Sequence, residues 1–306
     1  MTTPLERAPD ALVERVGLRA SLELCLKRED DHELGAFKWR GALPTVEGYR
    51  SSGASSVVTA STGNHGAAVA WACKQLGLDC VVYGPEHCSQ AKLDLIRAQG
   101  AETVLVGTDL DEAKEAARAV AANEGHAFFE DGVESAQFAG YGQIALELVE
   151  QLDVLPAAVV VPLGNGALLI GVGRALRRIS PETELIAVVA KDAPVMARSV
   201  AAKEPVEETG CETFADGLAV RVAIPSAVDA IVALDCRLLE VSERDLARAV
   251  GDYNSVGLRV EGSAAAALAA AREVRCAGPL VLLVTGSNID DTLHRRAVEE
   301  PTSFPD

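Results

Sequence analysis

The stretch "SSVVTASTGNHGAAVAWACKQLG", residues 55–77, predicts a strand, a loop and a helix in that order. Residues 55–61 form a short run rich in valine, typical of a buried strand, and residues 64–77 form an Ala-rich helical segment that ends at Gly77. The pattern continues along the chain. It predicts helices at 89–100 and 110–125 and further strands at 78–84, 101–107, 157–164, 184–190, 236–242 and 279–286.

Continuous apolar runs separated by helices are the signature of parallel strands that helices cover on both faces. We therefore expect an α/β protein with open, mostly parallel sheets. The last eight residues, "EEPTSFPD" (299–306), are expected to fray.

The composition excludes several classes of protein. The chain has 306 residues, of which 49% are hydrophobic, so it can bury a large core and form two lobes. Its formal net charge of −17 argues against binding to nucleic acid or to an anionic membrane surface. No apolar run approaches the length of a membrane span, and the first residues lack the core of a signal peptide.

The seven cysteines contain no Cys-x-x-Cys pair, and the five histidines are scattered. This spacing indicates neither a disulfide framework nor a zinc ribbon. We expect a reduced, cytoplasmic protein.

Three loops follow predicted strands, where open parallel sheets bind their ligands. "STGNHG" (61–66) combines hydroxyl and amide groups with a helix N-terminus, which favours a carboxylate or phosphate. It exceeds what an ordinary helix cap needs. "PLGNGALLIG" (162–171) is glycine-rich but matches neither a P-loop nor a dinucleotide fingerprint, so a plain strand–helix turn remains an alternative. "VTGSNID" (284–290) places Thr285 at the end of the most apolar strand.

A fourth stretch, "ELGAFKWRGALP" (33–44), places Lys38 between Phe37 and Trp39. A lysine is normally a solvated surface residue. Either its stem lies along apolar surface or its amine is held in a pocket for chemistry, and the stretch alone leaves both possibilities open.

Together these segments resemble one family, the pyridoxal-phosphate (PLP) enzymes of fold type II, in the threonine dehydratase and serine racemase branch. The matching motifs are "FKWRGA", "STGNHG", "GNGAL" and "TGSN", with weaker similarity at "AGYGQIALEL", "ADGLAV" and "VEGSAAAALAA". They occur in the family's order from about residue 23 to residue 290.

The resemblance implies two three-layer α/β lobes. The large lobe, residues 1–50 and 141–306, would bind PLP, and a small mobile lobe, residues 51–140, would carry the substrate-carboxylate loop. Lys38 resembles the family's catalytic Schiff-base lysine. The residues implied to bind the cofactor are Phe37, Lys38, Asn64, Gly164, Asn165, Gly166, Ala167, Leu168, Gly217, Glu261 and Thr285. Those implied to bind the substrate are Ser61, Thr62, Gly63, Asn64 and His65.

The implied activity is a PLP-dependent lyase reaction, β-elimination from a small hydroxyamino acid such as L-threonine or L-serine, giving a 2-oxo acid and ammonia. Thr285 would face the pyridine nitrogen with a hydroxyl rather than a carboxylate, which favours elimination over transamination. The partners implied are an amino-acid substrate and a second copy of the chain, as a homodimer.

Alternatives within the same fold are a racemase and a β-replacement synthase. Racemases have serine where this chain has Thr62, and their metal-binding glutamate falls on Ala190, so we expect no metal site. Cysteine and threonine synthases have aspartate where this chain has Trp39. A catalytically silent relative of the same fold is the alternative from a different class.

Overall fold

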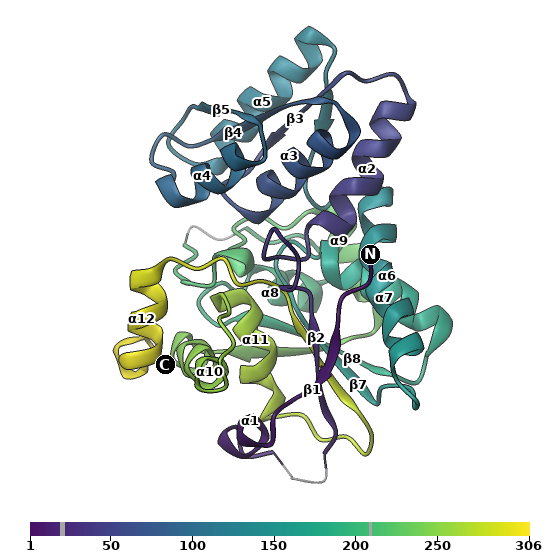
Figure 1. Cartoon of the computed structure of the whole chain (residues 1–306), viewed down its shortest axis with the longest axis vertical. Coiled ribbons are helices and arrows are strands. Elements are labelled where there is room, and N and C mark those ends of the chain that lie inside the picture. The colour runs from purple at the N-terminus through teal and green to yellow at the C-terminus, as the bar shows by residue number, and fades with distance from the viewer. Residues whose placement is uncertain (19–21, 208–209) are drawn as a thin grey trace. The chain divides into compact units, whose positions relative to one another are not determined.

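The computed structural model describes residues 1–18, 22–207 and 210–306. Its contacts divide the chain into two compact units (Figure 1). One is Lys38–Gly140, and the other joins Met1–Phe37 to Tyr141–Asp306. We refer to them as the inserted unit and the main unit. Helix α6 (Ser135–Gln151) contains the second boundary.

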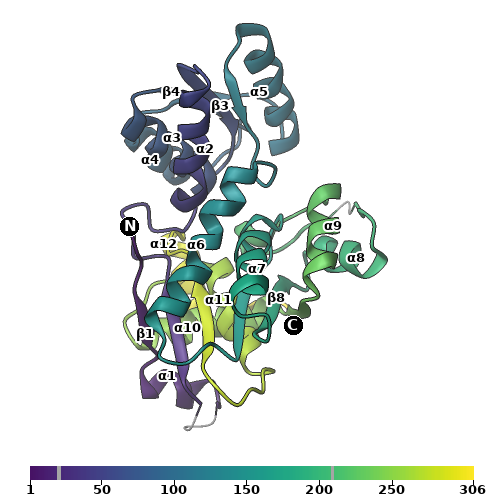
Figure 2. The same cartoon turned by 90° about the vertical axis from the view of Figure 1, so that its right-hand side faces the viewer.

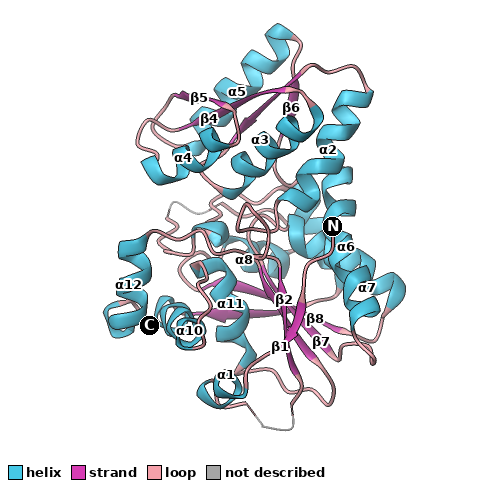
Figure 3. Ribbon diagram, in the orientation of Figure 1, coloured by secondary structure: helices cyan, strands magenta, loops and turns pink. Residues whose placement is uncertain are grey.

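The inserted unit is built on a four-stranded sheet in the order β5-β4-β3-β6, with every neighbouring pair parallel. Helix α5 packs on one face of this sheet, and α3 and α4 lie on the other face with α2 against α3 (Figure 3). The elements are α2 (Trp39–Ser51), β3 (Ser56–Ala60), α3 (Asn64–Leu76), β4 (Asp79–Gly84), α4 (Gln90–Ala98), β5 (Glu102–Leu105), α5 (Leu110–Glu124) and β6 (Ala127–Phe129).

The spacing of small side chains explains how α5 packs. Ala113, Ala117 and Ala121 recur every fourth residue, so they form one stripe along the helix. This stripe is buried against Val58 of β3 and Tyr83 of β4. Strand residues of the opposite parity, such as Val82, face α3 and α4 on the other side.

The main unit is built on a six-stranded sheet in the order β1-β2-β10-β7-β8-β9. Strand β1 is antiparallel to β2, and the other pairs are parallel. Its elements are β1 (Leu5–Arg7), α1 (Asp10–Arg15), β2 (Leu24–Arg28), β7 (Ala158–Pro162), α7 (Ala167–Ile179), β8 (Glu184–Ala190), α8 (Val195–Ala202), η1 (Asp216–Leu218), α9 (Pro225–Leu234), β9 (Arg237–Val241), α10 (Glu243–Ser255), α11 (Gly262–Ala271), β10 (Leu280–Val284), α12 (Asp291–Glu299) and η2 (Pro301–Ser303).

The core of the main unit depends on one helix that is apolar on all sides. All ten residues of α11 are buried, and the helix packs on β7, β8, β9 and β10. Such a helix is stable only when it is enclosed, which α10 achieves from the side away from the sheet. Helix α7 lies on the opposite face, where it contacts β7 and α9 (Figure 2).

The expected α/β class with mostly parallel sheets is confirmed. The predicted strands correspond to β3, β4, β5, β7, β8, β9 and β10. The expectation of a frayed tail is wrong, because Phe304 is buried with its ring 4.8 Å from that of Phe214. Within the described ranges, no helix is both long and apolar enough to cross a membrane.

Candidate functional site

The first group of expected site residues lies in the inserted unit, where β3 and β6 end. These strands are parallel neighbours with Thr59 in register with Phe129. Residues two positions farther on, Ser61 and Asp131, therefore emerge at the same edge of the sheet. This carboxyl edge is the usual position of ligand sites in open α/β sheets.

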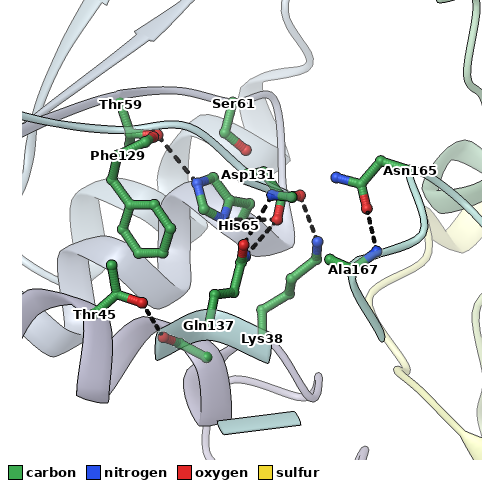
Figure 4. A network of polar contacts seen from close by, with 12 residues as sticks. Lys38, Thr45, Thr59, Ser61, His65, Phe129, Asp131, Gln137, Asn165 and Ala167 are labelled. Carbon is green, nitrogen blue, oxygen red and sulfur yellow. Dashed lines mark hydrogen bonds and ion pairs between the residues drawn. The ribbon is translucent and has the colours of Figure 1, made fainter. Parts of the chain in front are cut away.

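Lys38 immediately precedes α2 and already has helical dihedral angles. Its side chain is 15% exposed, and Nζ donates to Asp131 Oδ2 over 2.5 Å (Figure 4). Of the two possibilities left open by the sequence, the structure favours an amine held by a specific partner. A charge-assisted hydrogen bond of this kind fixes the end of a side chain that would otherwise be mobile.

The loop Ser61–His65 leads from β3 into α3, which begins at Asn64. Ser61 is buried, and its Oγ accepts a hydrogen bond from the N–H of Gly63 at 3.1 Å. Thr62, Gly63 and Asn64 are partly exposed. The positive end of the α3 dipole thus lies directly behind an accessible loop, which suits a carboxylate.

The His65 side chain points into the inserted unit rather than out of this loop. It is 6% exposed, its Nε2 lies 3.1 Å from Thr59 Oγ1, and its ring packs edge-on against Phe129. On the other side of the ring, Nδ1 lies 3.6 Å from Asp131 Oδ1. We call Lys38, His65 and Asp131 the charged cluster (Figure 4).

Sequence reasoning did not identify Asp131 or the residue that orients it, Gln137. The Gln137 amide donates to Asp131 Oδ1 at 2.6 Å, and its oxygen accepts the N–H of Gly132 at 2.8 Å. A signal was present, because Asp131 follows the apolar pair Phe128–Phe129. The sequence pattern does not predict β6, so nothing local marks Asp131 as a residue at the end of a strand.

The two acid–base groups beside Lys38 have shifted pKa values. Burial lowers the pKa of His65, the Asp131 charge raises it, and the Lys38 charge lowers it further, so the net shift is downward. Burial raises the pKa of Asp131, but attraction to Lys38 and His65 and hydrogen bonds from Lys38 and Gln137 lower it more. Asp131 is therefore a carboxylate with its pKa held well below the usual range.

The second group of expected residues lies in the main unit, in the loop between β7 and α7. A side chain at Gly164 would place its Cβ 2.2 Å from the carbonyl oxygen of Gly217, so only glycine fits there. Gly166 has φ of 97°, which also favours glycine. Asn165 Oδ1 accepts the N–H of Ala167 at 3.1 Å, so the backbone N–H of Ala167 already has a partner within the loop (Figure 4).

Thr285 follows the last residue of β10 and is 2% exposed. Its Oγ1 is buried and has no hydrogen-bond partner among the described residues. Its carbonyl accepts the N–H of Phe37, the residue before Lys38, at 3.1 Å. The Phe37 ring packs against that of Tyr141. We call residues 164–168 and Thr285 the neutral cluster.

Two other expected residues lie next to these loops. Gly217, in η1, donates its N–H to Ser263 Oγ at 3.0 Å. Glu261 immediately precedes α11, is buried, and donates its N–H to the carbonyl of Gly286. Both residues help to hold the loops that carry Gly164 and Thr285.

Residues 2–286 match the family described as pyridoxal-phosphate dependent enzymes. The chain belongs to this family. The family resemblance drawn from the sequence motifs is confirmed, and PLP is the cofactor that the family uses.

The chain is similar to a biosynthetic L-threonine dehydratase from Pasteurella multocida, with 34% identity over 220 residues. That alignment includes 72% of this chain and 42% of the relative, so the chain spans less than half the length of that protein. It is also similar to an L-threonine ammonia-lyase from Geobacter sulfurreducens, with 33% identity over 89% of this chain and 69% of the relative.

Among solved structures, the processed form of threonine deaminase isoform 2 from Solanum lycopersicum matches with a TM-score of 0.90 and 28% identity. The match covers 99% of this chain and 89% of that structure.

The neutral cluster fits PLP on an observation of its own. A buried hydroxyl without a partner is costly, and a pyridine nitrogen would accept the Thr285 hydrogen. No metal-ion site of three or more His, Cys, Asp or Glu side chains was found in the part of the chain that the structure describes.

Proposed function

We propose that this chain is a PLP-dependent ammonia-lyase that eliminates the β-hydroxyl of a small hydroxyamino acid, L-threonine or L-serine. The products would be a 2-oxo acid and ammonia. The family supports the cofactor, and the names of the two relatives support the reaction. The observation that carries the proposal is the unpartnered, buried hydroxyl of Thr285, where an enzyme that protonates the ring would have a carboxylate.

Each expected site residue has a proposed task. Lys38 would hold the cofactor and then remove the α-proton of the substrate at Nζ. Backbone N–H groups of residues 164–168 would hold the phosphate, with Asn165 Oδ1 giving up the Ala167 N–H that it now accepts. Thr285 Oγ1 would donate to the ring nitrogen. PLP, when bound, supplies an electron-withdrawing ring that stabilises negative charge at the substrate's α-carbon.

The substrate carboxylate is proposed to bind at residues 61–65, at the N-terminus of α3. This loop contains neither lysine nor arginine, so neutral donors and the helix dipole must provide the attraction. Because the His65 imidazole is buried, His65 would contact the substrate carboxylate through its backbone N–H rather than its side chain. Asn64 would also hydrogen-bond the cofactor's ring oxygen.

The oligomeric state and the location of the protein belong to the same proposal. We expect a homodimer, which light scattering on the purified chain would test. We also expect a cytoplasmic location, since all seven cysteines are free thiols, as they are in proteins of reducing compartments.

The direct test is product formation by the purified chain with PLP. L-threonine should give 2-oxobutanoate and ammonia, and L-serine should give pyruvate and ammonia. For each substrate, one ammonia should form for each 2-oxo acid. Racemase activity would instead yield the D-amino acid without ammonia. If neither amino acid releases ammonia while the chain carries PLP, the proposed function is wrong.

A further inference from the structure

The charged cluster has an arrangement that the proposed reaction does not by itself require. Three titratable side chains lie in a row, with Lys38 on one carboxylate oxygen of Asp131 and His65 facing the other (Figure 4). They come from the start of α2, the loop after β6 and the first turn of α3. All three belong to the inserted unit.

The hydrogen bonds of Thr59 define the His65 tautomer. Thr59 Oγ1 donates its only hydrogen to the carbonyl oxygen of Phe129 at 2.7 Å. It must therefore accept a hydrogen from His65 Nε2, which lies 3.1 Å away. A neutral His65 thus carries its proton on Nε2.

This tautomer places an acceptor against an acceptor. The lone pair of Nδ1 faces Asp131 Oδ1 at 3.6 Å, too far for a hydrogen bond but close enough for a strong charge interaction. A proton on Nδ1 would convert this contact into an ion pair. His65 is therefore placed to become the positive partner of Asp131.

In the present arrangement, Lys38 already provides that positive charge. Among the residues that the structure describes, the charged groups that act on His65 are Asp131 and Lys38, and its hydrogen-bond and ring partners Thr59 and Phe129 are neutral. A largely buried carboxylate is costly without a cation beside it. When the Lys38 amine loses its charge, Asp131 would remain as an uncompensated anion unless another group became positive.

We propose that Asp131 is a positioning residue that has one positive partner at all times, Lys38 while its amine is protonated and His65 once that amine is neutral. This inference rests on the proposed function in one respect, namely that Lys38 is the reactive lysine. An N–H bond breaks at Lys38 Nζ and an N–H bond forms at His65 Nδ1. Asp131 stays ionised, and the net charge of the three residues does not change.

The arrangement has a consequence for turnover. The proton is held on His65 Nδ1, on the other side of the Asp131 carboxylate from Lys38. It can therefore return to Nζ when Lys38 is again able to accept it. The proton need not exchange with bulk solvent, because the residue that holds it, His65, is only 6% exposed. Asp131 orients both partners because Gln137 fixes its Oδ1.

The test is the titration of His65, followed by ¹⁵N NMR on the full chain with labelled histidine and no added cofactor. Lys38→Met replaces the ammonium by a neutral side chain of similar length. The pKa of His65 should rise by about one unit or more in this variant, because a repelling charge is lost and the Asp131 charge is uncompensated. In the unaltered chain, the neutral ring should show the Nε2–H tautomer.

Three further proteins make the result specific. His65→Gln identifies the resonance, and Lys38→Met combined with Asp131→Asn should abolish the rise. Lys74→Met, at an exposed position on α3, should leave the His65 titration unchanged. Lys38→Gln serves as a second neutral variant if Lys38→Met does not fold by circular dichroism.

Equal His65 pKa values in the unaltered chain and in whichever neutral Lys38 variant folds would overturn the inference, as would an Nδ1–H tautomer in the unaltered chain. The experiment uses neither PLP nor substrate. Its failure therefore leaves the proposed function intact, and a failure to release ammonia would leave the His65 result intact.

Discussion

The two clusters differ in whether every buried polar side chain already has a partner. In the charged cluster of the inserted unit, Lys38 and His65 both face Asp131, and His65 also bonds to Thr59. In the neutral cluster of the main unit, the Thr285 hydroxyl is buried without a partner in the described structure. The charges of the charged cluster compensate one another, whereas the neutral cluster contains a hydrogen-bond donor that a ligand could pair with.

This difference suggests a division of labour. A group that must change its charge during a reaction is best surrounded by residues that can compensate for the change. A group that binds the cofactor only by hydrogen bonds does not change its charge, so a fixed dipole or hydroxyl is sufficient. We therefore expect substitutions in the charged cluster to alter turnover and pH dependence, and those in the neutral cluster to alter cofactor affinity.

The largest effect should come from Lys38→Ala. The lysine is proposed both to hold the cofactor and to remove the α-proton, so turnover should fall by about 1,000-fold or more. The measurement is the rate of ammonia release with L-threonine or L-serine. Lys74→Ala, at an exposed position on α3, is the matched control and should retain full activity. Substantial activity in Lys38→Ala would show that the charged cluster is not the catalytic one.

The next effect should come from Gly164→Ala in the neutral cluster. The added methyl group would lie 2.2 Å from the Gly217 carbonyl oxygen, so the backbone of the loop must move. An overpacking cost of about 1–3 kcal/mol corresponds to a loss of roughly 5- to 150-fold in PLP affinity. Equilibrium titration with PLP measures it. Gly48→Ala is the control, because no atom lies within 4 Å of the added methyl group.

A smaller effect is expected from Thr285→Val, which keeps the shape of the side chain and removes its hydroxyl. Losing one hydrogen bond should weaken PLP binding about 3- to 10-fold. The melting temperature of the cofactor-free protein should stay the same or rise, since an unpartnered buried hydroxyl is removed. Thr285→Ser should bind PLP normally. A lower melting temperature together with unchanged PLP affinity would mean that the hydroxyl has a structural role instead.

The smallest effect should be on the pH dependence of stability. The pKa of His65 is lowered on folding, so the unfolded chain takes up a proton below about pH 6.5 that the folded chain does not, and stability falls as pH falls. The pKa of Asp131 is also lowered, and its contribution is lost only at more acidic pH, below about 4. Urea unfolding between pH 7 and 5 should show a loss of about 1 kcal/mol that is absent in His65→Gln. An identical slope in both proteins would contradict the burial of a neutral imidazole.

Much of the fold could be predicted from the sequence because its strands are apolar and its helices end at glycines. Gly77 and Gly125 end α3 and α5 as expected. Strand β2 was not predicted because it contains Lys27, and a lysine normally indicates an exposed position. In the structure Lys27 is fully buried, and its amine donates to Glu147 at 2.6 Å. A partner 120 residues away cannot be read from local pattern.

The same reason explains what was missed in the site. Thr285 could be placed because a long apolar run precedes it. Strands β1 and β6 have three residues each, too few for a periodic signal. Asp131 follows β6, so its position beside Lys38 depends on a strand pairing that the sequence does not display. The packing of Phe304 on Phe214 is likewise a long-range contact.

The most direct measurement of the central claim locates the cofactor on the chain. The purified protein is incubated with PLP, reduced with borohydride to fix any imine, digested and examined by mass spectrometry. The phosphopyridoxyl group should be found on Lys38, and the visible absorbance band of the bound cofactor should be absent from Lys38→Ala. Modification of a different lysine in place of Lys38, or of none, would contradict the account.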